Sequence, residues 1–223
     1  GREIAYGFAA GNGLKVIDVT DKNNMTTLAT RTYPNLDYCH QGWLSEDRNY
    51  LFIDDEGDEL DLLGPDTSTT YVFDVSNPAD PQFLTSYTNG VGTIDHNLMV
   101  RGRFVFSANY TSGLRIFDTC DIQNVVEVGY FDTHPENNLK NYDGVWGVFT
   151  DFPSKIVIIS DRDRGLFVFD TSEAEATPPP LPKCEDTEPC GNGTVDEGET
   201  CDIAIPAGNP GAWHSRSQAA HDR

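Results

Sequence analysis

One short phrase occurs four times in this chain and constrains its fold more than any other feature. The copies read GLKVIDVT, TTYVFDVS, SGLRIFDT and RGLFVFDT, and each contains one repeat aspartate: Asp18, Asp74, Asp118 or Asp170. Successive repeat aspartates are 56, 44 and 52 residues apart. Spacings of this size suit a unit of several short strands with variable loops, and they are too long for most helical solenoids. The repeat therefore predicts an all-β fold, a β-propeller.

Each repeat is expected to be a four-stranded antiparallel blade that carries the phrase on its third strand. The β-prone runs and turns between them give three, four, four and three strands in the successive units. The first unit lacks an inner strand and the last an outer one, so the two do not combine into one ordinary blade. We expect about four blades of a larger propeller, of which this chain is a fragment. A closed four-bladed ring is the alternative.

Apolar alternation in the phrase predicts which side chains lie between the blades. The four residues expected there are Ile17, Phe73, Ile116 and Val168. The repeat aspartates recur with the fold, and we expect each to accept a backbone N–H at the end of its strand, as Asx-turn residues do. They are thus predicted to be structural, and we assign no catalytic residue.

Composition changes after the fourth repeat and predicts three segments. Residues 1–172 are expected to form the blades, 173–183 a proline-rich linker, and 184–223 a cysteine-containing tail, a truncated module. Four prolines in the five positions 178–182 favour an extended polyproline spacer. From residue 173 onward the chain is predicted to be extended and disordered. Cys190 and Cys201 are close enough in sequence to close a small disulfide loop.

Charge and hydropathy exclude two classes of partner. Fifteen basic and 36 acidic residues give a net charge of −21, which repels nucleic acid and anionic membranes and attracts cations. The sequence has no apolar run of about 18 residues, so no transmembrane segment is expected. Five cysteines favour an oxidising compartment.

Several of these stretches also resemble known families. The phrases GLKVIDVT and SGLRIFDT resemble the LVIVD repeat, a blade signature of bacterial and archaeal cell-surface proteins. Residues 1–172, with IDHNLMVRGRFVFSANYTSGLRIFD most clearly, resemble the C-terminal half of the choice-of-anchor B family of extracellular propellers. CGNGTVDEGETCD resembles a myxobacterial-type cysteine-rich segment as far as Asp202. The resemblance implies a secreted or surface-tethered protein with a protein or carbohydrate ligand.

Polar residues begin the first strand of the second, third and fourth units. Because inner strands line the channel of a propeller, His40, Asp95, His96 and Asp143 are expected to converge at its mouth. Imidazole and carboxylate together suit several transition metals, so these four residues are a candidate divalent-metal set. The alternative is structural, with each His bonded to a neighbouring backbone group and each Asp capping a turn.

An acidic insertion in the second unit is a second candidate for a cation. It offers oxygen ligands at a density that calcium favours, although the spacing is not that of an EF-hand. The alternative, which such charge runs favour, is a solvated acidic loop. The candidate calcium ligands are Asp54, Asp55, Glu56, Asp58 and Glu59.

Three aromatic residues, Trp43, Tyr110 and Trp146, are candidates for a ligand surface near the channel, although such rings more often pack between blades. The common hydrolase, phosphate-loop and dinucleotide motifs are absent from the sequence. Two functions are therefore expected: a binding propeller with a bound divalent cation, or a metal-dependent extracellular enzyme whose site lies at the channel mouth. The first is favoured, because a fold by itself does not supply a reaction.

Overall fold

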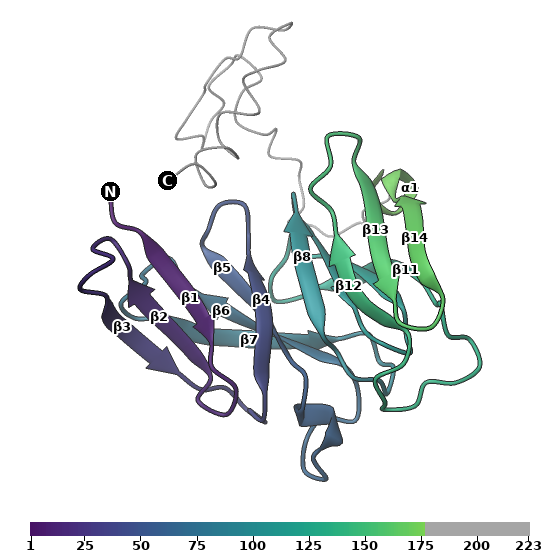
Figure 1. Cartoon of the computed structure of the whole chain (residues 1–223), viewed down its shortest axis with the longest axis horizontal. Coiled ribbons are helices and arrows are strands. Elements are labelled where there is room, and N and C mark those ends of the chain that lie inside the picture. Colours follow the sequence, from purple (N-terminus) through teal and green to yellow (C-terminus); the bar gives the residue numbers. More distant parts are fainter. Residues whose placement is uncertain (177–223) are drawn as a thin grey trace, which may run out of the picture. The chain divides into compact units, whose positions relative to one another are not determined.

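A computed structural model describes residues 1–176, and this part of the chain is almost entirely β (Figure 1). Its fourteen strands form four antiparallel sheets of three, four, four and three strands. This confirms the predicted fold of consecutive propeller blades. Blade 1 consists of β1 (Ile4–Phe8), β2 (Leu14–Asp18) and β3 (Thr26–Arg31), and blade 2 of β4 (Cys39–Leu44), β5 (Tyr50–Asp55), β6 (Thr69–Asp74) and β7 (Gln82–Thr88).

Blades 3 and 4 follow in the same order along the chain. In each blade, neighbours in sequence are neighbours in the sheet, so every blade is a simple meander. Blade 3 consists of β8 (Asn97–Arg101), β9 (Phe104–Ala108), β10 (Leu114–Asp118) and β11 (Val126–Phe131), and blade 4 of β12 (Val145–Phe149), β13 (Ile156–Asp161) and β14 (Gly165–Asp170). The repeat phrase lies on the third strand of blades 2, 3 and 4, as predicted, and on the strand after β1 in blade 1.

The apolar side chains of the repeat phrase pack the blades against one another with a fixed polarity. Wherever a neighbouring blade is described, the residue two positions before the repeat aspartate contacts the following blade, and the residue one position before it contacts the preceding blade. Each of the three interfaces is therefore a separate apolar cluster built from both neighbours. The side chains facing forward are Val16, Val72 and Ile116, and those facing back are Phe73, Phe117 and Phe169.

This polarity corrects part of the prediction about residues between blades. Phe73 and Ile116 are buried, but Val168 is 59% exposed and Ile17 is only half-buried. Val168 faces forward from blade 4, and Ile17 faces back from blade 1, where the described residues supply no further blade. The prediction for Val168 and Ile17 is wrong within the described residues because no described blade follows blade 4 or precedes blade 1.

All four repeat aspartates accept a backbone N–H from the residue two positions later, so the predicted structural role is confirmed. The acceptor–donor distances lie between 2.9 and 3.0 Å. These bonds turn the chain out of the third strand and toward the fourth. Hydrogen bonds from Thr20 hold the pKa of Asp18 down at about 2, from an ordinary 3.8, and bonds from Ser76 and Ser172 lower the pKa of Asp74 and Asp170.

The segment after β14 begins with a short helix, α1 (Ser172–Ala176), where the sequence predicts an extended chain from residue 173. Thr171 Oγ1 donates to Glu175 Oε1 (2.6 Å), and the same carboxylate binds Arg101 of β8. Ala174 packs on the apolar cluster between blades 3 and 4. These contacts fold the first residues of the predicted linker onto the propeller. The rest of the linker, the cysteine-containing tail and the Cys190–Cys201 disulfide lie outside the described residues.

None of the helices in residues 1–176 is long and apolar enough to cross a membrane. The longest of them, α1, has five residues, of which two are acidic. This agrees with the absence of a transmembrane segment from the sequence prediction.

The packing polarity predicts that the same substitution destabilises the protein by different amounts at two equivalent positions. Ile116→Asp should destabilise the protein by about 3 kcal/mol or more, because the charge would be buried without a partner between blades 3 and 4. Val168→Asp, at the equivalent position of blade 4, should cost about 1 kcal/mol or less because that side chain is exposed. Chemical denaturation of both variants would check this, and equal losses would contradict the assigned polarity.

The repeat aspartates predict a specific loss of stability in acid. A carboxylate whose pKa is lowered in the folded state stabilises it above the unfolded pKa, and this contribution is lost as pH falls toward the folded value. We expect the loss between about pH 4 and about pH 2, where Asp18 takes up its proton. The variant Asp18→Asn/Asp74→Asn/Asp170→Asn should lose less thermal stability over this range than the wild type. Parallel losses in the two proteins would exclude a role for these groups.

Candidate functional site

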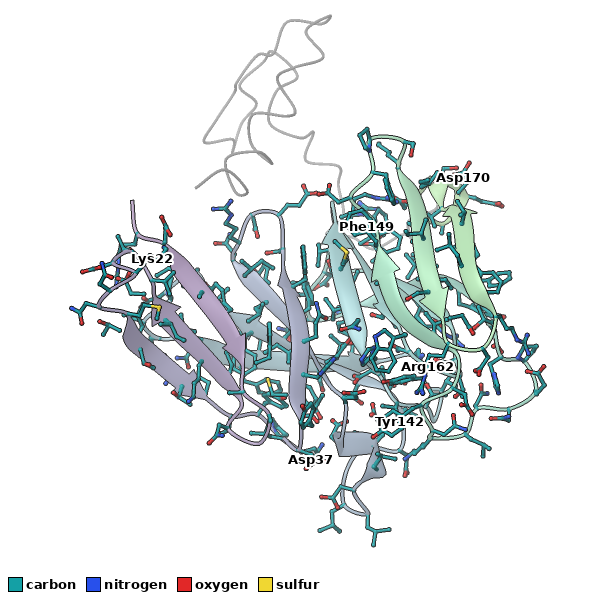
Figure 2. All side chains as sticks on the ribbon, viewed as in Figure 1. Lys22, Asp37, Tyr142, Phe149, Arg162 and Asp170 are labelled. Atoms are coloured by element: carbon teal, nitrogen blue, oxygen red, sulfur yellow. The ribbon has the colours of Figure 1, made fainter. Side chains whose placement is uncertain are left out.

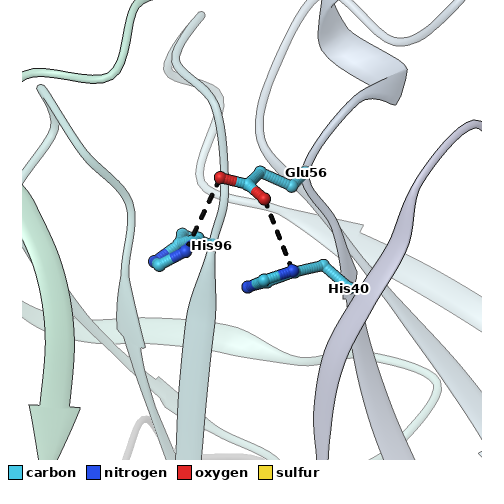
Figure 3. A group of neighbouring side chains, drawn as sticks. All are labelled: His40, Glu56 and His96. Atoms are coloured by element: carbon cyan, nitrogen blue, oxygen red, sulfur yellow. Dashed lines mark ion pairs between the residues drawn. The ribbon is translucent and has the colours of Figure 1, made fainter. Parts of the chain in front are cut away.

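Two histidines and one glutamate from blades 2 and 3 meet at a single point (Figure 3). His40 is the second residue of β4, Glu56 follows the end of β5, and His96 precedes the start of β8. One ligand atom from each side chain lies within 4.8 Å of the other two. His40 Nδ1 is 3.4 Å from Glu56 Oε2, and His96 Nε2 is 3.6 Å from Glu56 Oε1. We call this group the His–Glu–His site.

The local strand pairing explains why these three residues come together. In the β4–β5 hairpin Cys39 pairs with Asp55, and the Glu56 backbone N–H donates to the Tyr38 carbonyl (3.1 Å), so Glu56 lies beside the start of β4. Gln41 then joins β4 to the next blade, because its side chain both donates to and accepts from the backbone of Leu98 (2.9 and 2.8 Å). The side-chain amide of Gln41 thus makes the hydrogen bonds that connect β4 of blade 2 with β8 of blade 3.

The tautomer of His96 depends on a bond to a backbone carbonyl. His96 Nδ1 lies within hydrogen-bonding distance of the Trp146 carbonyl oxygen, which can only accept, and of Asn97 Nδ2 (2.7 Å); in the tautomer that donates to the carbonyl, Nδ1 carries the proton. Burial lowers the pKa of His96, whose side chain is 1% exposed, and this favours the neutral ring. In that state Nε2 presents a lone pair to Glu56 Oε1. Two electron-rich atoms at this separation leave room for a cation between them.

Glu56 is held from the other side by Tyr110. The Tyr110 hydroxyl donates to Glu56 Oε1, and burial raises the pKa of this tyrosine, so the hydroxyl keeps its proton. Tyr110 has φ of 40°, which is rare for a residue with a side chain, and its backbone pairs with Val145 of blade 4. Gly144 permits this approach, since a Cβ at that position would lie 2.4 Å from the Tyr110 carbonyl oxygen.

Aromatic rings surround the buried histidine and extend to the surface. The His40 and His96 rings stack with centroids 4.6 Å apart, and the Trp146 ring lies 4.5 Å from His96. Trp146 and Tyr142 are each close to half exposed, and Arg162 lies over the Trp146 ring. Arg162 also donates to the backbone carbonyl of Tyr142, and both residues are labelled in Figure 2. The neighbourhood of the His–Glu–His site is thus an aromatic surface with a single guanidinium.

The structure brings together part of the predicted metal set and adds a residue to it. His40 and His96 meet as predicted, but Asp95 and Asp143 do not belong to the group. Asp143 is exposed and accepts a hydrogen bond from Asn141 (2.9 Å), whereas Asp95 is fully buried. The third member, Glu56, was assigned from sequence to the acidic insertion. Counting outward from the β4–β5 turn would have set Asp55 opposite His40, whereas the register shift between Cys39 and Gln41 pairs Asp55 with Cys39.

The predicted ligand-surface residues have different surroundings. Tyr110 is completely buried, and its ring lies 4.8 Å from His96. Trp146 contacts His96 and reaches the surface. Trp43 is 43% exposed on β4, three residues beyond His40. Sequence reasoning did not separate the buried ring from the exposed ones.

The acidic insertion is not the solvated loop that the charge run favours. Asp54, Asp55 and Asp58 are completely buried, and Glu59 is 2% exposed. Asp55 accepts four hydrogen bonds, from the Tyr33 hydroxyl and three backbone N–H groups. By contrast, burial first and nearby carboxylates second raise the pKa of Asp58, Glu59 and Asp95. The solvated-loop interpretation was wrong because it was inferred from charge alone, without the strand pairing that places these carboxylates in the interior.

The comparisons with known proteins support the fold. The model of the LVIVD repeat family matches residues 67–89, which contain β6 and β7. No curated protein matches the chain.

Solved structures with propeller-like folds match most of the chain. A periplasmic gluconolactonase from Pseudomonas aeruginosa is 14% identical, with a TM-score of 0.54, over 80% of this chain and 51% of that one. A protein from Lactobacillus plantarum is 13% identical (TM-score 0.54; 78% and 50% covered), and a functionally unknown protein from Desulfotomaculum acetoxidans 15% (TM-score 0.53; 73% and 49%). This chain thus spans about half the length of these structures, and at such identities the likeness concerns the fold alone.

The close approach of Gly144 to Tyr110 gives a prediction with a matched control. Gly90→Ala should cost roughly 1 kcal/mol, because Gly90 has φ of 75° but no atom within 4 Å of the added Cβ. Gly144→Ala should cost more, about 3 kcal/mol, since the same backbone strain is joined by a clash with the Tyr110 carbonyl. Thermal denaturation of both variants measures the difference, and equal midpoints would show that the clash relaxes without cost.

Proposed function

We propose that this chain is a binding propeller whose His–Glu–His site holds a divalent transition-metal ion, with zinc the best fit. The observation that carries the proposal is that His96 Nε2 faces Glu56 Oε1 at 3.6 Å while Nδ1 of the same ring is bonded to the Trp146 carbonyl. Without a cation, two acceptors face each other in a buried site. A metal ion bound between them gives Nε2 a partner, while Glu56 Oε1 also accepts from the Tyr110 hydroxyl.

The ligand types and spacings support zinc in particular. Zinc takes nitrogen and oxygen ligands at about 2.0–2.1 Å in a tetrahedron, which places neighbouring ligand atoms about 3.3 Å apart. The two measured histidine–glutamate separations, 3.4 and 3.6 Å, are close to this value. A histidine ligand whose other ring nitrogen donates to a carbonyl is the usual outer-shell arrangement at such sites.

The surroundings of the site support a role in binding a ligand from solution. Three protein ligands leave one tetrahedral position for a further ligand, and His40 is 27% exposed, so solvent reaches one side of the site. The half-exposed rings of Trp146 and Tyr142 beside it suit stacking on a sugar or an apolar side chain. We therefore propose a protein or carbohydrate partner, and, from the likeness to LVIVD cell-surface proteins, a secreted or surface-tethered location.

A metal-dependent enzyme is the second candidate, and the count of three protein ligands favours it. Catalytic zinc sites have three such ligands and an open position for water or substrate, whereas structural sites have four. One structural neighbour is named a gluconolactonase, which makes lactones the first substrates to test. Turnover by the zinc-loaded protein, and its loss in His96→Ala, would separate the enzyme from the binding module.

The proposal predicts that zinc raises the thermal midpoint of the chelator-treated protein. His40→Ala/His96→Ala should lose this response, because two of the three ligands are gone. Asp143→Asn is the matched control, since Asp143 is exposed and outside the site, and it should respond like the wild type. A midpoint that zinc leaves unchanged, or that it raises equally in the double variant, would refute the site.

Zinc affinity should also depend on pH with a defined sign. The proton and the metal compete for Nε2 of His96, so affinity should be constant at neutral pH and fall in acid. Because burial lowers the pKa of His96, that competition should begin below its ordinary value of 6.5. Calorimetric zinc titrations across this range would measure the effect, and affinity that rises in acid would contradict the assignment of His96 as a ligand.

A further inference from the structure

An arginine without a carboxylate partner, Arg162, lies beside the aromatic surface of the His–Glu–His site. It is exposed in the turn between β13 and β14, and in the described part of the chain no carboxylate lies within ion-pair distance of its guanidinium. Arg164, two residues later in the same turn, pairs with Glu136. The carboxylates on either side of Arg162 in sequence, Asp161 and Asp163, accept backbone N–H groups instead. In a chain with a net charge of −21, this guanidinium is free to pair with an external anion.

The position of Arg162 in blade 4 is that of Glu56 in blade 2. Each is the first residue after the second strand of its blade. The Glu56 N–H donates to the carbonyl of Tyr38, the residue before β4 (3.1 Å). The Arg162 N–H donates to the carbonyl of Gly144, the residue before β12 (2.8 Å), and the same register shift follows the first residue of β4 and of β12. Equivalent positions two blades apart thus carry a carboxylate and a guanidinium.

Two contacts hold the Arg162 guanidinium in place. Its Nη1 donates to the Tyr142 carbonyl, and its Cζ lies 5.3 Å from the centroid of the Trp146 ring (Figure 2). The Trp146 ring in turn lies 4.5 Å from that of His96, and the Tyr142 ring lies 5.3 Å from that of Tyr110. The guanidinium is therefore connected to the His–Glu–His site by two separate routes.

One edge of the guanidinium remains free. Nη1 is bonded to Tyr142, whereas neither Nε nor Nη2 donates to any group within residues 1–176. The N–H groups on Nε and Nη2 point the same way and can bind both oxygens of a carboxylate. Because the guanidinium is already stacked on an aromatic ring and anchored through Nη1, less side-chain freedom is lost when a carboxylate binds. Arg162 is thus pre-organised for a carboxylate from outside the chain.

We propose that the ligand of this propeller is a sugar acid, a hexuronate whose carboxylate binds the Nε and Nη2 edge of Arg162. The inference rests on the proposed function, because the open metal position would accept a hydroxyl oxygen of the same sugar. The half-exposed rings of Trp146 and Tyr142 contact its apolar C–H face. A sugar acid carries a carboxylate, hydroxyl groups and an apolar face on one ring, whereas an acidic peptide side chain offers only the carboxylate.

The net charge of the chain narrows the ligand further. A surface with a net charge of −21 repels polyanions, so a polymer of consecutive uronates is disfavoured. Arg162 and a bound zinc ion supply positive charge at one place only. We therefore expect a single uronate in an otherwise neutral saccharide, bound more weakly as salt is added.

Calorimetric titration of the zinc-loaded full chain with methyl β-glucuronide and methyl β-glucoside tests the proposal. The two sugars differ only in the carboxylate that replaces a hydroxymethyl group. We expect the glucuronide to bind at least about tenfold more tightly, because a hydrogen-bonded carboxylate–arginine pair contributes at least that factor. The amide of N-acetylglutamate, which carries a peptide carboxylate, should bind more weakly than the glucuronide. If it binds more tightly, the partner is a protein and the sugar acid is refuted.

Variants of the β13–β14 turn assign the effect to one guanidinium. Arg162→Gln should lose the preference for the glucuronide, and Arg162→Lys should keep only part of it, because lysine retains the charge without the paired N–H groups. Arg164→Gln is the matched control: it removes the same charge from the same turn, but that charge is paired with Glu136, so binding should equal that of the wild type. Glucuronide binding by Arg162→Gln equal to that of the wild type would refute the assignment.

The zinc response distinguishes failure of this inference from failure of the metal site. If zinc raises the thermal midpoint of the wild type but the glucuronide binds no better than the glucoside, the sugar acid is refuted and the metal site stands. If chelator-treated wild type prefers the glucuronide and chelator-treated Arg162→Gln does not, the carboxylate site at Arg162 stands even where zinc has no effect.

Discussion

The packing of one blade on the next is the interaction on which the rest of this structure depends. A single blade has two apolar faces and cannot bury either alone, so each third strand presents one side chain forward and the next one back. Val72 and Phe73 illustrate this, because they are adjacent in sequence and belong to different interfaces. Successive side chains point to opposite faces of a β-strand, and in a propeller they therefore contact the preceding and the following blade in turn.

The candidate sites lie where these interfaces reach the inner strands. His40 comes from blade 2 and His96 from the start of blade 3, and the carbonyl that orients His96 belongs to Trp146 of blade 4. Their ring stacking and the Gln41 bridge depend on the spacing that the apolar clusters set. A residue far from the sites, in the middle of a third strand, therefore contributes to their geometry by keeping the blades in register.

Much of the fold could be read from the sequence, because the repeat marks each third strand and each Asx turn at the aspartate. The candidate sites were harder to predict from the sequence, because they depend on how strands and blades pair. Glu56 looked like one carboxylate in an acidic run until its backbone bond to Tyr38 and its 3.4 Å distance from His40 showed where it lies. The burial of Asp54 and Asp58 was missed for a related reason: charge density suggests solvent, while the hydroxyls of Thr70 and Tyr71 that draw these residues inward are distant in sequence.

The forward and backward faces also give the row of blades a direction. At every interior interface a forward face meets a backward one, which leaves a backward face with Ile17 on blade 1 and a forward face with Leu166 and Val168 on blade 4. The backward face of blade 1 is complementary to the forward face of blade 4, and neither face is complementary to a second copy of itself. A blade packed against either surface would therefore have to present the opposite face, so the direction of packing is the same at every step along the row of blades.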